Sequence, residues 1–257
     1  MIKTKIEWTD SSWNPITGCY HPCPYCYARG TANRFKGCEA AKDGSTDQKT
    51  VYLTERQHCV DSRGNRRAAA YPYGFVPTFH EYRLNDLQTK GLGKTIFVCS
   101  MADMFGEWVP DEWIVKVFDA CKAAPGHRYL FLTKNPKRYI ELDNKGLLPQ
   151  GDEFWYGSTV TDPEMLFFWS NNHNTFLSIE PILAPFLEGE GIVDKVKWVI
   201  FGAETGNRKD KVVPQRNWIE YAVEVCQKNG IPIFMKDSMI PIWGEDIITQ
   251  FPWDLSE

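Results

Sequence analysis

Short apolar segments recur along the chain from residue 95 onward, and each is followed by a polar turn. Six of them are strand candidates: Thr95–Ser100, Tyr129–Thr133, Trp155–Val160, Phe176–Glu180, Trp198–Ala203 and Ile233–Lys236. They contain few polar interruptions, as expected for parallel strands that are buried on both faces. Helical patterns lie between most of them, at Asp111–Ala124, Pro136–Leu147, Pro163–Asn171 and Pro214–Lys228. This alternation predicts an α/β fold with parallel strands and right-handed crossovers.

One more strand, expected around Lys5–Thr9, would turn this set into a partial (β/α) TIM-type barrel. A chain of 257 residues has the right length for one such barrel, so we predict a single domain over residues 1–257. The polar, glycine-rich segment at about residues 35–67 does not fit the pattern. We interpret it as an insertion that forms a lid or a partner surface.

The composition limits the partners and the location that can be expected. A formal net charge of −4 and a pI near 5.8 give no global basic field, which disfavours a nucleic-acid partner, although a local basic strip would suffice. The chain has no apolar leader and no run of about 18 apolar residues. We therefore expect a soluble, cytoplasmic protein with no membrane partner.

Three cysteines, Cys19, Cys23 and Cys26, lie in the run TGCYHPCPYCYARG with C-x3-C-x2-C spacing. Its prolines and glycine favour a loop, so the three sulfurs can converge as thiolate ligands. Three thiolates suit an iron–sulfur cluster, because a four-iron cubane then keeps one iron open for a ligand that is not protein. The spacing therefore predicts a cluster with an open coordination position.

Other interpretations of the cysteines stay open. His21 lies between the first two and would complete a Cys3His zinc site. Cys38 and Cys59 flank the polar segment and are candidates for a second ligand set. The remaining cysteines are scattered and are interpreted as ordinary residues: Cys99, Cys121 and Cys226.

Polar side chains follow nearly every predicted strand. They are Asp10, Ser100, Asp103, Thr133, Lys134, Ser158, Thr159, Glu180, Glu204, Lys236 and Asp237. In parallel barrels the active site lies at the carboxyl ends of the strands. Single members can be helix caps, Asp103, Ser158 and Asp162 above all. The set as a whole predicts a polar ligand in the barrel mouth, because buried charges are costly unless they are paired or bound.

The cysteine run resembles the motif of the radical S-adenosylmethionine (radical SAM) superfamily, including the aromatic Tyr25 before the last cysteine. The strand-end segments also resemble, in order and over nearly the whole chain, the blocks of the phage Gp37/Gp68-like family, a domain of unknown function (DUF5131). The blocks are IEWTDSSWNPITGC, FVPTFHEYRL, VCSMADMFGEWVPDEWI, FLTKNPKR, FLSIEPIL, WVIFGAETG and IPIFMKD. The residues of the polar segment do not align with that family.

The resemblance implies a barrel of the radical SAM type, a [4Fe–4S] cluster on the three cysteines and SAM on the open iron. It also implies an electron donor such as flavodoxin or ferredoxin. Candidate cofactor-binding residues are Ser100, Met101, Ala102 and Asp103 for the SAM amino group, Lys134 or Arg208 for its carboxylate, Ser158 or Glu180 for the ribose, and Gly202 and Glu204 near the adenine. Candidate catalytic residues are Lys134, Glu180, Glu204, Lys236 and Asp10.

Three classes of function follow. The leading hypothesis is a radical SAM enzyme that modifies or repairs a nucleobase or nucleotide. In this hypothesis bases would stack on the aromatic run YPYGFVPTF, although such residues more often cover the flank of a barrel. Phosphates would contact the basic run RGNRR with Lys134, Lys137 and Arg138, although such a run more often forms a solvated loop. The alternatives are a radical SAM enzyme acting on a small metabolite or peptide side chain, and a non-enzymatic iron–sulfur or zinc module that binds a partner.

Overall fold

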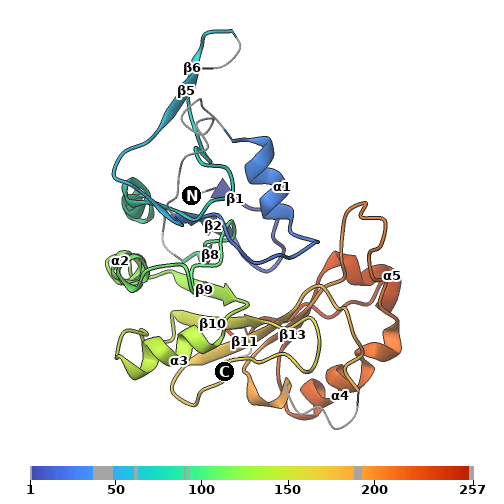
Figure 1. The fold of residues 1–257 in the computed structure, drawn as a ribbon. Coiled ribbons are helices and arrows are strands. Elements are labelled where there is room, and N and C mark those ends of the chain that lie inside the picture. Colours follow the sequence, from blue (N-terminus) through green and yellow to red (C-terminus); the bar gives the residue numbers. More distant parts are fainter. Residues whose placement is uncertain are drawn as a thin grey trace. The chain divides into compact units, whose positions relative to one another are not determined.

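The computed structural model of the chain describes residues 2–36, 49–60, 63–89, 91, 93–187 and 193–254. They form two compact units, which Figure 1 shows as a ribbon. The first unit comprises Met1–Lys5 and Thr9–Tyr129, and the second comprises Ile6–Trp8 and Leu130–Glu257. The prediction of a single domain stays a prediction.

The first unit has a short parallel pair at its centre. Strand β2 (Ser11–Trp13) runs parallel to β8 (Thr95–Val98), and β1 (Ile2–Lys3) runs antiparallel to β2. A second sheet has the order β3 (Ile16–Thr17), β7 (Thr78–His80), β4 (Val51–Leu53), and β5 (His58–Val60) forms a two-stranded ribbon with β6 (Arg66–Ala68). The helices are α1 (Tyr27–Arg34), the 3-10 helix η2 (Glu81–Thr89) and α2 (Asp111–Lys122).

The second unit holds the longer parallel sheet. Strand β9 (Arg128–Thr133) enters it at Leu130, and β10 (Phe154–Thr159), β11 (Asn174–Ile179), β12 (Val199–Phe201) and β13 (Ile233–Met235) follow in chain order. The pairs from β10 to β13 are parallel. Its helices are α3 (Lys137–Asn144), α4 (Glu220–Lys228) and α5 (Ile240–Trp243), with 3-10 turns η3 (Val193–Lys195), η4 (Arg216–Trp218) and η5 (Asp237–Met239).

Strands β10, β12 and β13 are buried along their whole length, as is β11 after its first residue, which is what parallel strands covered on both faces require. Each strand of this sheet lies next to the one before it in the chain, as in a (β/α) barrel and unlike a doubly wound sheet. The predicted mixed α/β class with parallel strands is confirmed, and the strand order is consistent with a partial (β/α) barrel. The six strand predictions from Thr95 onward are confirmed to within a few residues.

The helix predicted over Pro163–Asn171 is wrong, because side chains satisfy the backbone of this segment in place of a helical ladder. The Asp162 carboxylate accepts from the Glu164 amide at 2.9 Å, and the Ser158 hydroxyl accepts from the Phe168 amide at 2.9 Å. Such local bonds compete with helix formation. The other three predicted helices are present as α2, α3 and α4, the last preceded by η4.

The strand predicted over Lys5–Thr9 is also wrong, since the strand begins later, at Ser11. Within the predicted insertion, residues 37–48, and Cys38 with them, lie outside the described residues. Its later part is structured: Val51 and Leu53 of β4 are buried and pair with β7, and β5 and β6 form the ribbon. Those residues therefore belong to sheets.

Candidate functional site

The cysteine loop (residues 18–26) lies within the first unit, after β3 and before α1. Gly18 starts it with a φ of +86° and donates from its amide to the Met101 carbonyl at 2.9 Å. A Cβ at this position would run into the Val76 carbonyl. Only glycine meets both conditions, because other residues rarely adopt this φ and would clash with the neighbouring backbone. The loop is therefore fixed at its first residue.

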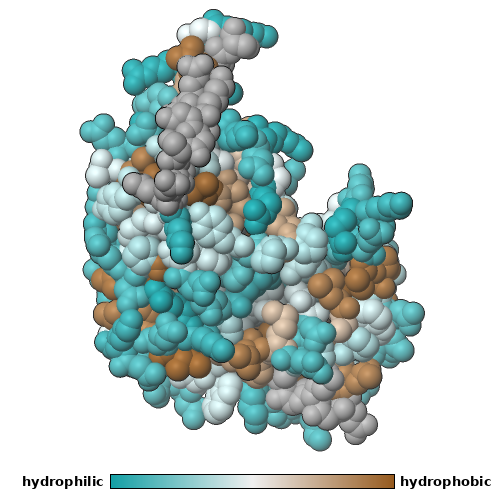
Figure 2. All heavy atoms as spheres, viewed as in Figure 1, coloured by the Kyte–Doolittle hydropathy of each residue, from teal (hydrophilic) through white to brown (hydrophobic). Residues whose placement is uncertain are grey.

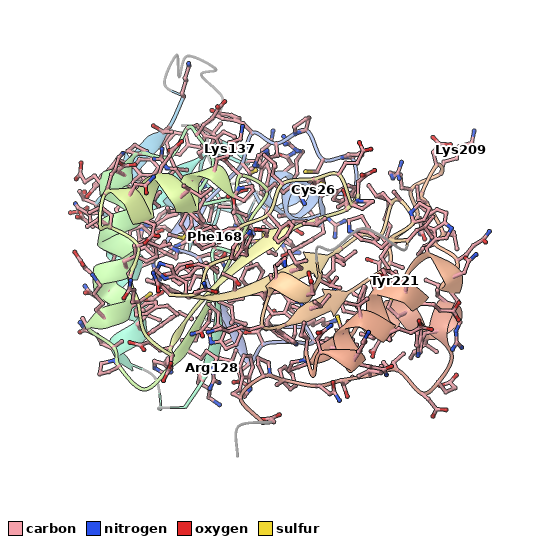
Figure 3. All side chains as sticks on the ribbon, turned by 90° about the horizontal axis from the view of Figure 1, so that it is seen from below. Cys26, Arg128, Lys137, Phe168, Lys209 and Tyr221 are labelled. Atoms are coloured by element: carbon pink, nitrogen blue, oxygen red, sulfur yellow. The ribbon has the colours of Figure 1, made fainter. Side chains whose placement is uncertain are left out.

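Cys26 ends the loop as the N-cap of α1, as Figure 3 shows. Its sulfur accepts from the Arg29 amide at 3.4 Å, and its own amide donates to the Cys23 carbonyl at 3.4 Å. Helix α1 buries Ala28 and Ala32 against Phe75, Met101 and Cys19. The packing of α1 thus positions Cys26 directly, and Cys23 through its bond to Cys26.

Cys19 is buried, whereas Cys23 and Cys26 are half-buried, and all three are free thiols. Burial raises the pKa of the Cys19 thiol to about 12, and the charge of Asp103 adds to this, against the opposing effect of the His21 and Asp103 backbone amides. The Cys19 thiol therefore holds its proton, which a metal ion would have to displace in order to bind the sulfur as a thiolate.

Two side chains, Arg29 and Asp103, bond to the loop at His21. The Arg29 guanidinium donates to the His21 carbonyl at 2.7 Å and lies 4.8 Å from the centre of the Phe75 ring. The Asp103 carboxylate lies 2.9 Å from Nε2 of His21 and also accepts from the Phe105 amide at 3.0 Å. A carboxylate behind a histidine ring is the arrangement that orients histidine as a metal ligand.

Among the described residues, no three or more His, Cys, Asp or Glu side chains are arranged to hold one metal ion. The expectation that the three sulfurs converge on one point is therefore not met for a single ion. A [4Fe–4S] cluster takes one thiolate per iron, so its three sulfurs need not meet at one atom. Three thiols from one short loop have the donor chemistry that such a cluster requires.

The predicted SAM-binding turn, Ser100–Asp103, lies against the cysteine loop. Met101 packs on Cys19, and Ala102 forms a β-bridge with Gly18. The turn follows Cys99, which has a φ of +61°, and Asn14 supports it by accepting from the Met101 amide at 2.9 Å and from the Ser100 hydroxyl at 3.2 Å. Asn14 was missed from the sequence, although its position before Pro15 is a turn signal.

Asp10 does not lie where the predicted strand would place it. Because β2 begins at Ser11, Asp10 precedes the strand, and its carboxylate accepts from the Thr95 amide at the start of β8, at 2.8 Å. It therefore lies at the amino ends of β2 and β8, whereas the cysteine loop comes after β2 and β3 in the chain and contacts the turn that follows the carboxyl end of β8. Asp10 therefore does not follow a strand, as had been expected, and a catalytic role for it stays a prediction.

In the second unit, three neighbouring strands bring predicted residues together at their carboxyl ends. Glu180 follows β11, Gly202 follows β12 and Lys236 follows β13. The Lys236 ammonium lies 3.0 Å from the Glu180 carboxylate, whose other oxygen accepts from the Ser178 hydroxyl at 3.1 Å. A Cβ at position 202 would lie 2.6 Å from Oε1 of Glu180. Glycine at 202 thus leaves room for the ion pair.

The surroundings of Lys236 favour its protonated form. Burial is the largest single effect and opposes the charged ammonium, but the charge and hydrogen bond of Glu180, together with the charges of Glu7 and Asp237, outweigh it, so the pKa of Lys236 is raised. The four residues Ser178, Glu180, Gly202 and Lys236, which we call the strand-end cluster, form a charged but locally neutral site.

The other predicted residues of this unit have partners within it. Glu204 is buried and binds Arg208 through both carboxylate oxygens, at 2.6 and 2.7 Å, and this pairing lowers the pKa of Glu204. Ser158 is fully buried and accepts from the Phe168 amide. Lys134 follows β9 and is half-buried. Their proposed roles toward a cofactor stay predictions.

Residues 3–247 match the family described as "Protein of unknown function (DUF5131)". None of the curated proteins and none of the solved structures matches the chain. In the part of the chain that the structure describes, no helix combines the length and apolar character needed to span a membrane.

Proposed function

The chain belongs to the DUF5131 family of proteins of unknown function, and from the geometry of its cysteine loop we propose that it is a radical SAM enzyme. In this proposal Cys19, Cys23 and Cys26 hold a [4Fe–4S] cluster, and SAM binds beside it. The observation that carries the proposal is the placement of three free thiols on one braced loop against the turn Ser100–Asp103, which follows the carboxyl end of β8. That is the end of parallel strands at which barrel enzymes carry their active sites.

When bound, such a cluster with one open iron supplies the electron that cleaves SAM to methionine and a 5′-deoxyadenosyl radical, which takes hydrogen from a substrate. The residues of the chain serve to bind and orient. Gly18 and Arg29 keep the loop in one conformation, which preserves the spacing of the ligands. The carbonyls of Ser100 and Met101 each retain a second lone pair, and these are acceptors for an ammonium group such as that of SAM.

We assign the strand-end cluster to a ligand that carries both a carboxylate and an ammonium group. Lys236 and Glu180 neutralise each other in the structure, so such a ligand would exchange one ion pair for two. The substrate of the leading hypothesis is a nucleobase or nucleotide, and the electron donor is a flavodoxin or ferredoxin. A small metabolite or a peptide side chain is the alternative substrate class.

Anaerobic reconstitution with iron and sulfide, followed by dithionite reduction in the presence of SAM, tests the proposal. We expect 5′-deoxyadenosine and methionine in equal amounts. Adding nucleotides or oligonucleotides separates the substrate classes: a change in the yield of 5′-deoxyadenosine favours the nucleobase substrate, and a yield that responds only to peptides or small metabolites favours the alternative.

The second candidate is a non-enzymatic zinc module, which would require His21 and the cysteines to rearrange around one ion. Asp103 holds Nε2 of His21 at 2.9 Å, which leaves Nδ1 as the nitrogen for a metal beside the cysteines. Metal analysis of protein purified without oxygen decides between the two. Stoichiometric zinc that is lost in His21→Ala supports the zinc module, whereas iron and sulfide that survive His21→Ala support the cluster.

A further inference from the structure

The β5–β6 ribbon carries a concentration of positive charge that the proposed function has not used. Four of the chain's eleven arginines lie between positions 56 and 67, while the segment 54–70 contains only two acidic residues, Glu55 and Asp61. The four arginines are Arg56, Arg63, Arg66 and Arg67, and all are exposed. This density stands out in a chain with a net charge of −4.

The ribbon presents arginine on both of its faces. Val60 pairs with Arg66 and Cys59 pairs with Arg67 in the antiparallel register. Directly opposed residues share a face, and consecutive residues alternate between faces, so Arg66 and Arg67 point to opposite sides. Figure 1 shows the two strands extending away from the rest of the first unit, and Figure 2 shows hydrophilic residues along them.

The base of the ribbon is anchored near the cysteine loop. Arg83 donates to the Ala70 carbonyl at the end of the ribbon and to the Asn14 carbonyl, both at 2.8 Å. Asn14 in turn supports the turn at Ser100 and Met101, as described above. Arg56 adds a contact, with its guanidinium 5.7 Å from the centre of the Tyr82 ring. The ribbon is therefore joined to the candidate site by a chain of hydrogen bonds within one unit.

We propose that the β5–β6 ribbon binds the phosphate backbone of a nucleic acid. Guanidinium groups match phosphate geometry and stay charged at any physiological pH, so an exposed arginine ribbon has phosphate as its natural ligand. Exposed aromatic rings occur in the same unit: Tyr27 beside the last cysteine is 60% exposed and Tyr20 is 44% exposed. Rings of this kind stack on bases, which a phosphate-lined membrane surface does not offer.

This inference rests on the proposed function, for which a polymeric nucleic acid would be the substrate class. Binding of nucleic acid to the ribbon can nevertheless be measured without the iron–sulfur cluster. Fluorescence anisotropy of full-length apoprotein with fluorescein-labelled oligothymidylate, and with a duplex of mixed sequence, measures the affinity as a function of salt. In Arg66→Gln/Arg67→Gln we expect the affinity to fall on the order of tenfold and the slope of log K against log salt to shrink by roughly 1 for each arginine.

Two matched variants separate charge at the ribbon from other effects. Lys209→Gln/Lys228→Gln removes the same charge from exposed positions of the second unit, Lys209 being labelled in Figure 3, and should bind as wild type does. Arg66→Lys/Arg67→Lys keeps the charge and should keep the salt slope. The proposal is supported if the lysine variant keeps the salt slope, the second-unit control keeps the wild-type affinity, and only the ribbon glutamine variant loses affinity.

Wild-type binding by the ribbon glutamine variant, an equal loss in the second-unit control, or no binding by the wild type would overturn the inference. So would binding to phosphatidylserine vesicles that depends on Arg66 and Arg67 while oligonucleotides do not bind, because that result assigns the ribbon to a membrane surface. Oligonucleotide binding without 5′-deoxyadenosine formation would refute the proposed function but not nucleic-acid binding by the ribbon. Formation of 5′-deoxyadenosine without oligonucleotide binding would refute only the role of the ribbon.

Discussion

The cysteine loop of the first unit differs from the strand-end cluster of the second unit in the partners that its polar side chains have. The sulfurs of the loop have weak contacts, with backbone amides 3.4 Å from Cys19 and Cys26. In the strand-end cluster, by contrast, the Lys236 ammonium is already 3.0 Å from a carboxylate. The sulfurs of the loop are thus the groups that a metal would bind in the proposed function, whereas the cluster is an ion pair that a ligand must compete with.

This difference predicts how sensitive each region is to change. In the proposed function, loss of one cysteine would remove one of the three ligands of the cluster. When Lys236 is replaced in the strand-end cluster, the Glu180 carboxylate that is left behind keeps its hydrogen bond from Ser178 and is partly exposed to water, so it is partly stabilised. The expected effects therefore decrease from the loop to the cluster and then to positions that only shape the fold.

The largest effect is expected from Cys19→Ala, Cys23→Ala and Cys26→Ala, each made alone. Each should abolish the iron and sulfide content of reconstituted protein and with it the cluster's visible absorption, because three ligands are the minimum for a cluster with one open iron. Cys121→Ala, a buried cysteine in α2, is the matched control and should retain the cluster. Full iron content in any of the three loop variants would end the assignment of that residue.

The strand-end cluster should respond next. Lys236→Met leaves the Glu180 carboxylate without its cation and should cost about 1–3 kcal/mol of the free energy of unfolding. Adding Glu180→Gln to it should restore part of that loss, because no uncompensated charge is left. Additive costs in the double variant would show that the two charges do not depend on each other.

Acid should weaken the first unit through His80. This histidine is fully buried between Thr17 and Tyr82, and burial, with the nearby charge of Arg83 as the second cause, lowers its pKa to about 2. The unfolded chain takes up a proton on this ring below pH 6.5 and the folded chain does not, so stability is full above pH 6.5 and falls as the pH drops from there toward 2.

From this one group we expect the free energy of unfolding to be about 2 kcal/mol lower at pH 5 than at pH 7. Chemical denaturation at both values measures it, with His80→Asn as the comparison: the variant is less stable at pH 7 but loses less between the two values. Equal pH dependence in wild type and His80→Asn would contradict the account.

The smallest effect is expected from Gly30→Ala in α1. Gly30 is exposed, and no atom lies within 4 Å of a Cβ built there, so alanine should stabilise the helix that carries Cys26 by up to about 1 kcal/mol. Cluster content should not change. The matched substitution Gly18→Ala should do the opposite, because it forces a φ of +86° on alanine and a clash with Val76. Thermal unfolding of both variants checks the pair.

The sequence was most informative where local pattern decides the structure. The apolar strands, the helices α2 and α4 and the grouping of three cysteines on one loop all follow from short-range signals. The segment Pro163–Asn171 was misjudged because its proline and spacing suit a helix, while the bonds from Ser158 and Asp162 that prevent one depend on the tertiary environment or on a local turn. The first strand was misplaced because Thr9 and Asp10 bond to Thr95, which is 85 residues away from Asp10.

Partners of charged residues were also beyond the reach of the sequence. Glu180 and Lys236 are far apart in the chain and meet because β11, β12 and β13 are neighbours. Arg208 pairs with Glu204 at helical spacing although no helix is present there, so its assignment to a SAM carboxylate did not consider the nearer carboxylate. Asn14 and Arg29 act through backbone groups, which leave no pattern of their own in a single sequence.

The central claim, that the cysteine loop holds a cluster with an iron open to SAM, is tested most directly by the products of one anaerobic reaction. Reconstituted wild-type protein, reduced with dithionite and supplied with SAM, is separated by liquid chromatography and its products are identified by mass spectrometry. The account predicts 5′-deoxyadenosine and an equal amount of methionine, absent in Cys23→Ala. Intact SAM after reduction of protein that contains a full complement of iron and sulfide would contradict it.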